Sequence, residues 1–132
     1  MRDDRFPPPA EQRPILIVDD EPGIHQLLID ALVDEGYCTP AAGDGREALA
    51  LLKQFTPGLI LLDLRMPRMD GIAFAAALRR RAHPQPPVVV VTAAPFDAET
   101  LDRLGVAEVL VKPFVLDAVF SHVERLLSPA GA

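Results

Sequence analysis

Five short apolar runs recur along the chain, and each is followed by a segment in which apolar residues return every three or four positions. The runs span residues 14–18, 37–42, 59–62, 88–91 and 109–111. Continuous apolar runs of this length, bounded by Gly and Pro, are typical of strands that are buried on both faces. The run at 37–42 contains Pro40, which cannot donate a backbone hydrogen bond, so we expect this strand at an edge of the sheet.

The segments between these runs show the spacing of one face of an α-helix. We expect helices over residues 22–35, 48–55, 70 to about 83, 97–104 and 116–127. The apolar face of the first helix is formed by Ile24, Leu27, Leu28, Ala31 and Leu32. Gly36 follows at the position where a glycine often ends a helix. The three arginines at 79–81 are expected as a solvated last turn, where the helix dipole favours cations.

The alternation of strand and helix predicts an α/β fold with one parallel sheet. Strands this apolar must be covered by helices on both faces, and right-handed crossovers make the sheet parallel. We therefore expect a doubly wound sheet over residues 14–127, in one domain. Residues 1–13 are polar and contain three consecutive prolines, which indicates a flexible tail, and residues 128–132 are expected as a second, short tail.

Composition narrows the class of protein further. With 13 basic and 19 acidic residues the formal charge is −6, which argues against binding nucleic acid or an anionic membrane. No apolar run approaches the roughly 20 residues of a membrane span, and the first residues contain no stretch suited to a signal peptide, so we expect a cytoplasmic protein. The single cysteine, Cys38, excludes a disulfide scaffold and a cysteine-ligated metal site. We expect Cys38 to fill space in or beside the core.

Polar residues stand at the carboxyl ends of four predicted strands: Asp19, Asp20, Asp63, Thr92 and Lys112. In a parallel sheet these ends share one edge, which is where open α/β folds bind their ligands. Clustered carboxylates raise one another's pKa, and Mg²⁺ with oxygen ligands relieves their repulsion. Together with a lysine and a hydroxyl they supply the parts needed for phosphoryl transfer. The alternative is a set of ordinary polar strand ends, with the lysine as a solvated partner of the acids.

Four motifs carry a resemblance to a known family: VDDEPG at 18–23, LLDLRMPRMDG at 61–71, TA at 92–93 and KPF at 112–114. They resemble the receiver domain of two-component response regulators, over roughly residues 14–127. The resemblance implies a flavodoxin-like (βα)₅ fold with strand order 2-1-3-4-5. It also implies a signalling module that assists its own phosphorylation and dephosphorylation and turns over no external substrate.

The resemblance also implies a role for each acid at the sheet edge. Asp63 matches the residue that accepts a phosphoryl group from a histidine kinase or a histidine phosphotransfer protein. Asp20 matches the direct Mg²⁺ ligand, and Asp19 matches the acid that binds the metal mainly through water. Arg65 stands where the family supplies a backbone carbonyl to Mg²⁺.

The same comparison gives roles to the last two strand ends. Thr92 matches the hydroxyl that moves to meet the phosphoryl group, and Lys112 matches the lysine that pairs with it. The bond between Lys112 and Pro113 matches one that is cis in the family, and X-Pro bonds are the ones at which cis is cheap. Arg65 and Ala94 occupy two positions that line the path of the hydrolytic water, so we expect them to set the lifetime of the phosphoryl group.

The chain departs from the family pattern on one side. The family usually has Tyr or Phe three residues before the lysine, where this chain has Val109. A valine cannot swing a ring between exposed and buried positions, so Val109 is expected to pack, with Phe96 or Phe114 as candidates to report phosphorylation. The fourth helix, at 97–104, is expected to be short, and isolated helices of that length are marginal. We therefore expect an atypical switch.

Two other functions fit parts of the pattern. A Mg²⁺-dependent phosphohydrolase with an aspartyl nucleophile often carries a second acid two residues later, where this chain has Arg65. A receiver-like domain that docks a partner without phosphorylation predicts losses among the five strand-end residues, and none is missing. The downstream protein target is unknown from the sequence, as is whether the domain stands alone or belongs to a longer chain. A homodimer through the amphipathic last helix is also compatible.

Overall fold

The computed structural model describes residues 13–66, 68–81, 85–93 and 95–127. A five-stranded parallel sheet forms the middle layer, with the strand order β2-β1-β3-β4-β5. The strands are β1 (Ile15–Val18), β2 (Ala41–Ala42), β3 (Leu59–Leu62), β4 (Val88–Thr92) and β5 (Glu108–Val111). The helices are α1 (Pro22–Asp34), α2 (Gly45–Leu51), α3 (Gly71–Arg79), α4 (Ala98–Arg103) and α5 (Leu116–Leu127). This is the predicted flavodoxin-like (βα)₅ fold.

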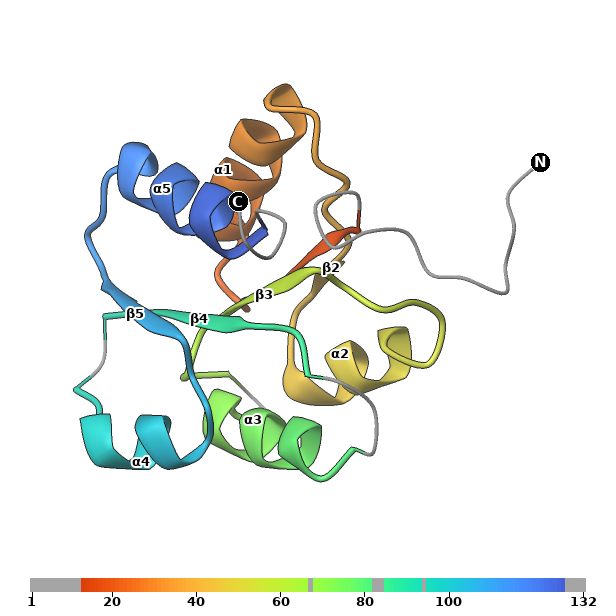
Figure 1. Ribbon diagram of the computed structural model, residues 1–132, viewed down its shortest axis with the longest axis vertical. Coiled ribbons are helices and arrows are strands. Elements are labelled where there is room, and N and C mark those ends of the chain that lie inside the picture. Colours follow the sequence, from red (N-terminus) through yellow and green to blue (C-terminus); the bar gives the residue numbers. More distant parts are fainter. Residues whose placement is uncertain (1–12, 67, 82–84, 94, 128–132) are drawn as a thin grey trace.

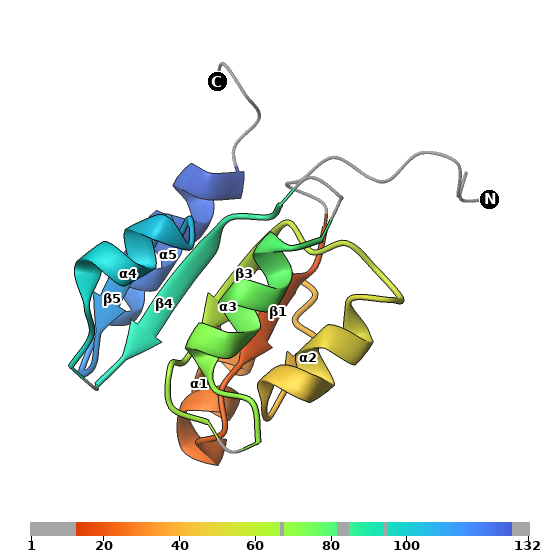
Figure 2. The ribbon, with the colours of Figure 1, turned by 90° about the horizontal axis from the view of Figure 1, so that it is seen from below.

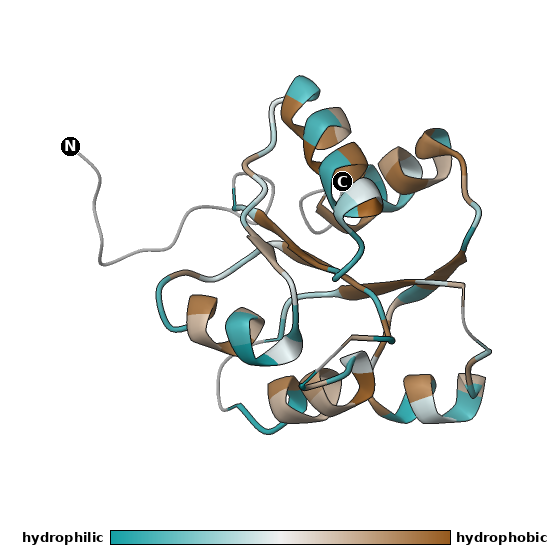
Figure 3. Ribbon diagram, turned by 180° about the vertical axis from the view of Figure 1, so that it is seen from behind, coloured by the Kyte–Doolittle hydropathy of each residue, from teal (hydrophilic) through white to brown (hydrophobic). Residues whose placement is uncertain are grey.

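Helices α1 and α5 cover one face of the sheet, and α2, α3 and α4 cover the other (Figure 1). Successive strand residues point to opposite faces, so each central strand contributes to two cores. Leu16 and Ile60 lie in the core under α2 and α3, whereas Ile17 and Leu61 lie in the core under α1 and α5. Figure 3 shows the consequence as hydrophobic central strands between helices in which hydrophobic and hydrophilic residues are mixed.

The second strand is shorter than the predicted 37–42. Only Ala41 and Ala42 pair with β1 as a ladder, although the carbonyls of Cys38 and Pro40 accept hydrogen bonds from Ile15 and Ile17. Its position at the sheet edge is as expected. The prediction for Cys38 was wrong: its side chain is exposed, because this edge segment has no further strand beside it.

Three helix predictions also need correction. In α1 the buried residues are Leu28 and Leu32, whereas Leu27 is 44% exposed, because the buried stripe is narrower than the apolar one. Helix α2 ends at Leu51 and not at Phe55, because the next residues form tight turns through hydrogen bonds such as Lys53 N to Ala50 O. Phe55 still packs against the core, from the turn that follows.

Helix α3 ends at Arg79, earlier than predicted, and His83 lies outside the described residues. The last turn closes through hydrogen bonds from Arg80 N to Ala77 O and from Arg81 N to Leu78 O. Arg81 is not simply solvated, because its guanidinium donates to the carbonyl of Leu52 at 3.3 Å. The predicted tails, 1–13 and 128–132, lie outside the described residues except for Arg13, and the domain limits remain predictions.

Strands β1 and β3 end level with each other, and β4 continues two residues farther in the same direction. Val18 of β1 lies opposite Leu62 of β3, and Leu62 lies opposite Val90 of β4. Figure 2 shows this edge, where the arrowheads of the central strands point to the same end of the molecule. The residues that follow these strands therefore meet at one edge. No helix in the described parts of the chain is long and apolar enough to cross a membrane.

Candidate functional site

Three carboxylates meet at the carboxyl edge of the sheet. Asp19 follows β1 and Asp63 follows β3, and a hydrogen bond from Asp63 N to Val18 O, 2.8 Å long, keeps these two strand ends together. Asp19 and Asp63 are buried, whereas Asp20 is exposed. One oxygen from each carboxylate lies within 4.8 Å of the others. The structure thus brings together the three acids that the sequence predicted.

The loop after Asp63 is held by a close approach of two backbone segments. Gly71 N donates to Leu64 O at 3.0 Å, and a Cβ on Gly71 would lie 2.4 Å from the carbonyl oxygen of Asp63. Only glycine fits there without moving the backbone at Asp63. The side chain of Asp70 caps α3 by accepting from Ala73 N at 2.8 Å, as expected for an aspartate at this position. The close packing of Gly71 against this loop therefore fixes the backbone position of Asp63.

The surroundings of Asp63 favour its neutral form. Burial raises the pKa of its carboxyl, and the charge of Asp19 raises it further. The N–H of Arg65, which donates to Asp63 Oδ1 at 3.3 Å, and the ammonium of Lys112 act against this, but the pKa remains above its ordinary value. A cation at this edge would lower this pKa, because a nearby opposite charge favours the carboxylate.

Lys112 is the ammonium at this edge, and it contacts three acids. Its Nζ lies 3.2 Å from Glu21 Oε1, 3.4 Å from Asp19 Oδ2 and 3.7 Å from Asp63 Oδ2. Burial lowers the pKa of this ammonium, but the carboxylates of Asp19, Asp63 and Glu21 outweigh burial and raise it. Lys112 is thus held charged between the ends of β1, β3 and β5.

Glu21 was missed as a site residue. It directly follows the two acids of the first strand end, and its N–H donates to Asp19 Oδ1 at 2.8 Å. The run of three acids at 19–21 was the available signal, but nothing in the sequence shows which acid contacts a lysine 91 positions away.

Thr92 ends β4 and is completely buried. Its carbonyl oxygen accepts a hydrogen bond from Lys112 N at 2.8 Å, and this bond holds the carboxyl ends of β4 and β5 together. The bond between Lys112 and Pro113 is cis, as expected. Arg65 points its side chain into solvent, and Ala94 lies outside the described residues.

A shallow depression of about 490 Å³ opens at Asp20, the exposed member of the three acids. Its lining is Asp20, Leu64, Arg65, Met66 and Asp70. Two of the three acids that the sequence assigned to Mg²⁺ are buried, and the exposed one, Asp20, faces this depression. The depression gives the candidate site an opening to solvent.

A second ion pair near the site was not predicted. Asp44 caps α2 by accepting from Glu47 N at 2.8 Å, and its other oxygen accepts from Arg68 Nε at 2.6 Å. The hydrogen bond from Glu47 N has the larger effect and that from Arg68 the next, and together they hold the pKa of Asp44 below its usual range. Arg68 has a φ of 63°, a strained value for a residue with a Cβ. The β3–α3 loop is therefore attached to α2 as well as to α3.

The side of the molecule at α4 and β5 is less buried than the centre. Helix α4 has six residues, which confirms that it is short, and Leu101 is its only buried residue. Val109 is partly buried against the core under α2 and α3, so it packs as expected. Phe114 packs against the other core, whereas Phe96 is 38% exposed.

The acids fit a hard divalent cation. All three offer carboxylate oxygens, two are buried, and Mg²⁺ in proteins is bound through a few carboxylates and retained waters. Asp19, Asp20 and Asp63 could hold such an ion between them, close to Lys112 and Thr92.

Comparison with known proteins identifies the family. The model of the response regulator receiver domain matches residues 15–124. The chain is 38% identical over 116 residues to the regulatory protein AtoC of Escherichia coli, covering 86% of this chain and 25% of AtoC. It is 41% identical over 107 residues to the regulator of RpoS of E. coli, covering 80% of this chain and 32% of that protein. The chain thus spans about a quarter to a third of these relatives.

Solved structures agree with the sequence comparison. The response regulator protein TrrA of Thermotoga maritima, in complex with Mg²⁺-BeF, is 33% identical with a TM-score of 0.78, over 87% of this chain and 99% of that one. The chemotaxis response regulator CheY4 of Vibrio cholerae is 31% identical with a TM-score of 0.81, over 88% and 99%. The acidic cluster lies at the carboxyl edge of the sheet, where the sequence predicted it. The chain belongs to the receiver domain family of two-component response regulators, whose members are signalling modules rather than classical enzymes.

Proposed function

We propose that this receiver domain accepts a phosphoryl group on Asp63 from a histidine kinase or a histidine phosphotransfer protein, the partners of receiver domains. The observation that carries the proposal is the placement of Asp63. Its carboxylate is buried at the end of a central strand, 3.7 Å from an ammonium and within reach of two further carboxylates. Burying carboxylates close to one another costs free energy unless a bound cation or a transferred charged group compensates for it.

In the proposed reaction a carboxylate oxygen of Asp63 attacks the phosphorus of the phosphohistidine. The new O–P bond forms as the N–P bond breaks, and the imidazole nitrogen leaves with the electron pair and takes up a proton. Water later attacks the phosphorus of the aspartyl phosphate, which releases inorganic phosphate and restores the carboxylate. The domain assists both steps on itself.

Lys112 and Thr92 are proposed to hold the transferred group. The ammonium of Lys112 already lies between Asp19, Glu21 and Asp63, so a short movement brings it to a phosphoryl oxygen on Asp63. Thr92 offers a hydroxyl from the end of the neighbouring strand β4. Both groups stabilise charge that increases on the phosphoryl oxygens during transfer.

Asp20 is proposed as a direct ligand of Mg²⁺, Asp19 as a ligand through water, and Arg65 as the donor of a backbone carbonyl, together with Asp63. The chemistry that a bound Mg²⁺ supplies is neutralisation of the carboxylates and the phosphoryl oxygens. Asp19 also orients the site without metal, because it accepts from Glu21 N and from Lys112 Nζ.

Phosphorylation replaces the single charge of the Asp63 carboxylate by a phosphoryl group that carries about two negative charges, and we propose that the side formed by α4, β5 and α5 responds. Its exposed apolar residues, Phe96, Val111 and Val115, form a surface suited to an unidentified downstream protein. With Val109 packed in place of an aromatic residue, the response would run through movement of the short α4. A homodimer and a cytoplasmic location stay predictions.

The test is phosphorylation by a small-molecule donor. The chain is incubated with acetyl phosphate and Mg²⁺, and the intact mass is recorded before and after. We expect a labile gain of one phosphoryl group that is absent in Asp63→Asn. Asp70→Asn is the matched control, because Asp70 ends the loop that follows Asp63 and lines the neighbouring depression. A gain that persists in Asp63→Asn, or that disappears only in Asp70→Asn, contradicts the proposal.

A further inference from the structure

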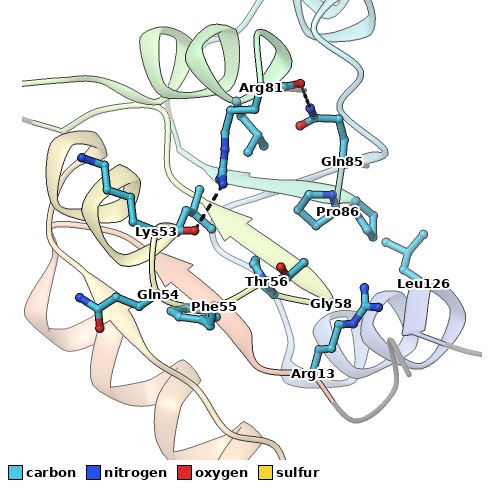
Figure 4. A pocket seen from close by; sticks show the side chains of 14 residues that line it. Arg13, Lys53, Gln54, Phe55, Thr56, Gly58, Arg81, Gln85, Pro86 and Leu126 are labelled. Atoms are coloured by element: carbon cyan, nitrogen blue, oxygen red, sulfur yellow. Dashed lines mark hydrogen bonds between the residues drawn. The ribbon is translucent and has the colours of Figure 1, made fainter. Parts of the chain in front are cut away.

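A second cavity lies at the opposite edge of the sheet from Asp63 (Figure 4). It has a volume of about 840 Å³. Its walls are the turn between α2 and β3 and the segments that precede β3 and β4, including Pro57 and Gly58 before β3, and Pro86 and Pro87 before β4. We call it the basal cavity. Its volume is in the range of ligand sites in proteins.

The floor of the basal cavity is apolar. It is lined by Leu52 and Leu78, which belong to the core under α2 and α3, and by Phe55 and Leu126 at its sides. Phe55 comes from the turn after α2 and Leu126 from the last turn of α5, so the floor joins elements from both faces of the sheet. An apolar side chain seated here would be largely removed from water, which favours binding in proportion to the area buried.

The charged residues around this floor are all basic. Among the described residues that line the basal cavity, Arg13, Lys53 and Arg81 carry charge and no acid is present. Figure 4 shows Arg81 and Arg13 on different sides of the start of β3. The protein as a whole carries a formal charge of −6, so a local group of three cations runs against the general charge.

The backbone at this edge offers few donors to an anion. Pro57, Pro86 and Pro87 have no N–H, and Gly58 N is used by Pro14 O at 2.9 Å. An anion in the basal cavity would therefore be bound by side chains. Guanidinium groups suit carboxylates because they donate two parallel hydrogen bonds.

Arg81 also has a structural contact. Its Nη2 donates to the carbonyl of Leu52 at 3.3 Å, and its own carbonyl accepts from Gln85 Nε2 at 3.1 Å. The first contact uses one of the five N–H donors of a guanidinium. It fixes the side chain across the cavity, so that less conformational freedom is lost when a ligand binds.

We propose that the basal cavity is a docking site for a short acidic segment of a partner protein, with Leu or Phe side chains between its carboxylates. The apolar residues would enter the floor formed by Leu52, Phe55 and Leu78, and the carboxylates would pair with Arg13, Lys53 and Arg81. Among the described residues that line the cavity, a short segment meets these cations and no acid. A nucleic acid extends beyond the cavity over a protein whose formal charge is −6, which disfavours it.

This site lies at the edge opposite Asp63, and so it could hold a partner whether or not the domain is phosphorylated. Binding is therefore measured without phosphoryl donor and with EDTA, so that its failure says nothing about phosphorylation. The probe is a fluorescein-labelled peptide in which Glu and Asp alternate with Leu and Phe. Fluorescence anisotropy gives its dissociation constant for the complete chain. An equal peptide with Gln and Asn in place of the acids is the first control.

We expect the acidic peptide to bind, the neutral peptide to bind at least about tenfold more weakly, and added salt to weaken the acidic one, because exposed charges are screened. Arg81→Glu and Lys53→Glu should each weaken binding by about tenfold or more. Arg80→Glu is the matched control, because Arg80 is the exposed neighbour of Arg81 and does not line the cavity. Arg81→Glu also removes the hydrogen bond to the carbonyl of Leu52. If that variant fails to fold, the result with Lys53→Glu decides the test.

Amide chemical shifts locate the peptide. Shifts confined to the turn at 52–58 and to 85–87 support the proposal. No binding, equal binding of the neutral peptide, an equal loss in Arg80→Glu, or shifts centred on β5 and α5 overturn it. Tighter binding of a single-stranded DNA oligonucleotide than of the peptide overturns the choice of partner.

Discussion

The acidic cluster at the carboxyl edge of the sheet and the cavity at its amino edge are lined by side chains of opposite charge. At the carboxyl edge, Asp19, Asp63 and Glu21 surround one cation, Lys112. At the amino edge, Arg13, Lys53 and Arg81 line a cavity to which no described residue contributes an acid. Four-residue strands that are buried on both faces separate these ends. Because such strands leave no place for charge along their length, polar chemistry in this fold is confined to the two edges.

The two edges also differ in the contacts that hold their loops. The loop after Asp63 is attached to α3 through Gly71 and to α2 through Arg68 and Asp44. The amino edge is formed by turns around an open cavity, with Arg81 as a tie between α3 and the end of α2. A site that performs chemistry needs its reacting groups held in a fixed geometry, whereas a docking site needs accessible surface for its partner.

The largest expected effect is on the rate of phosphorylation at the carboxyl edge. Lys112→Met removes the ammonium that lies 3.7 Å from Asp63 Oδ2, and we expect the initial rate with acetyl phosphate and Mg²⁺ to fall by about a hundredfold, as for other lost electrostatic stabilisers. Intact mass against time measures it. Arg80→Met, a cation on the exposed end of α3, is the control and should leave the rate unchanged. Equal rates in both variants would remove the role of Lys112.

The next effect tests the tight loop. A Cβ on Gly71 lies 2.4 Å from the carbonyl oxygen of Asp63, so Gly71→Ala should lower the free energy of unfolding by about 2 kcal/mol, as overpacked sites do. Gly23→Ala is the control, because nothing lies within 4 Å of a Cβ there. Urea denaturation measures both. A loss in Gly71→Ala no greater than in Gly23→Ala would show that the loop yields easily.

A smaller effect follows from the raised pKa of Asp63, caused by burial and then by Asp19. For an acid, a folded pKa above the unfolded one means that the charged form destabilises the fold at every pH above both values. In EDTA at neutral pH, Asp63→Asn should therefore raise the melting temperature. The gain should fade as the pH falls through the folded pKa and vanish below the unfolded one. A gain that is independent of pH would assign it to another cause, and Asp102→Asn on exposed α4 is the control.

The smallest effect concerns Mg²⁺. Binding to the folded state raises its melting temperature by mass action, so added Mg²⁺ should stabilise the chain, and less so in Asp20→Asn. Ca²⁺ and Na⁺ at equal ionic strength separate specific binding from screening. Stabilisation of Asp20→Asn equal to that of the parent would place the ion elsewhere.

The central fold could be predicted from the sequence because its strands are buried on both faces. An apolar run such as 59–62 admits few alternatives, and the parallel order then brings Asp19, Asp63 and Lys112 to one edge. The short α4 and the packed Val109 also followed from local pattern.

The errors arose where tertiary contacts decide. Leu27 and Cys38 are apolar or nearly so, yet are exposed because no element covers them. Phe55 shows helical spacing but lies in a turn. The pairs of Glu21 with Lys112 and of Arg68 with Asp44 join residues far apart in the sequence, and local pattern does not indicate which of several acids a cation will contact.

The most direct test of the account is to locate the phosphoryl group. The chain is treated with acetyl phosphate and Mg²⁺, the acyl phosphate is reduced with borohydride, and peptides are sequenced by mass spectrometry. Reduction converts a phosphorylated aspartate to homoserine. The account predicts homoserine at position 63 and aspartate at positions 19, 20 and 70. Homoserine at any of those three positions, or none at position 63, would contradict it.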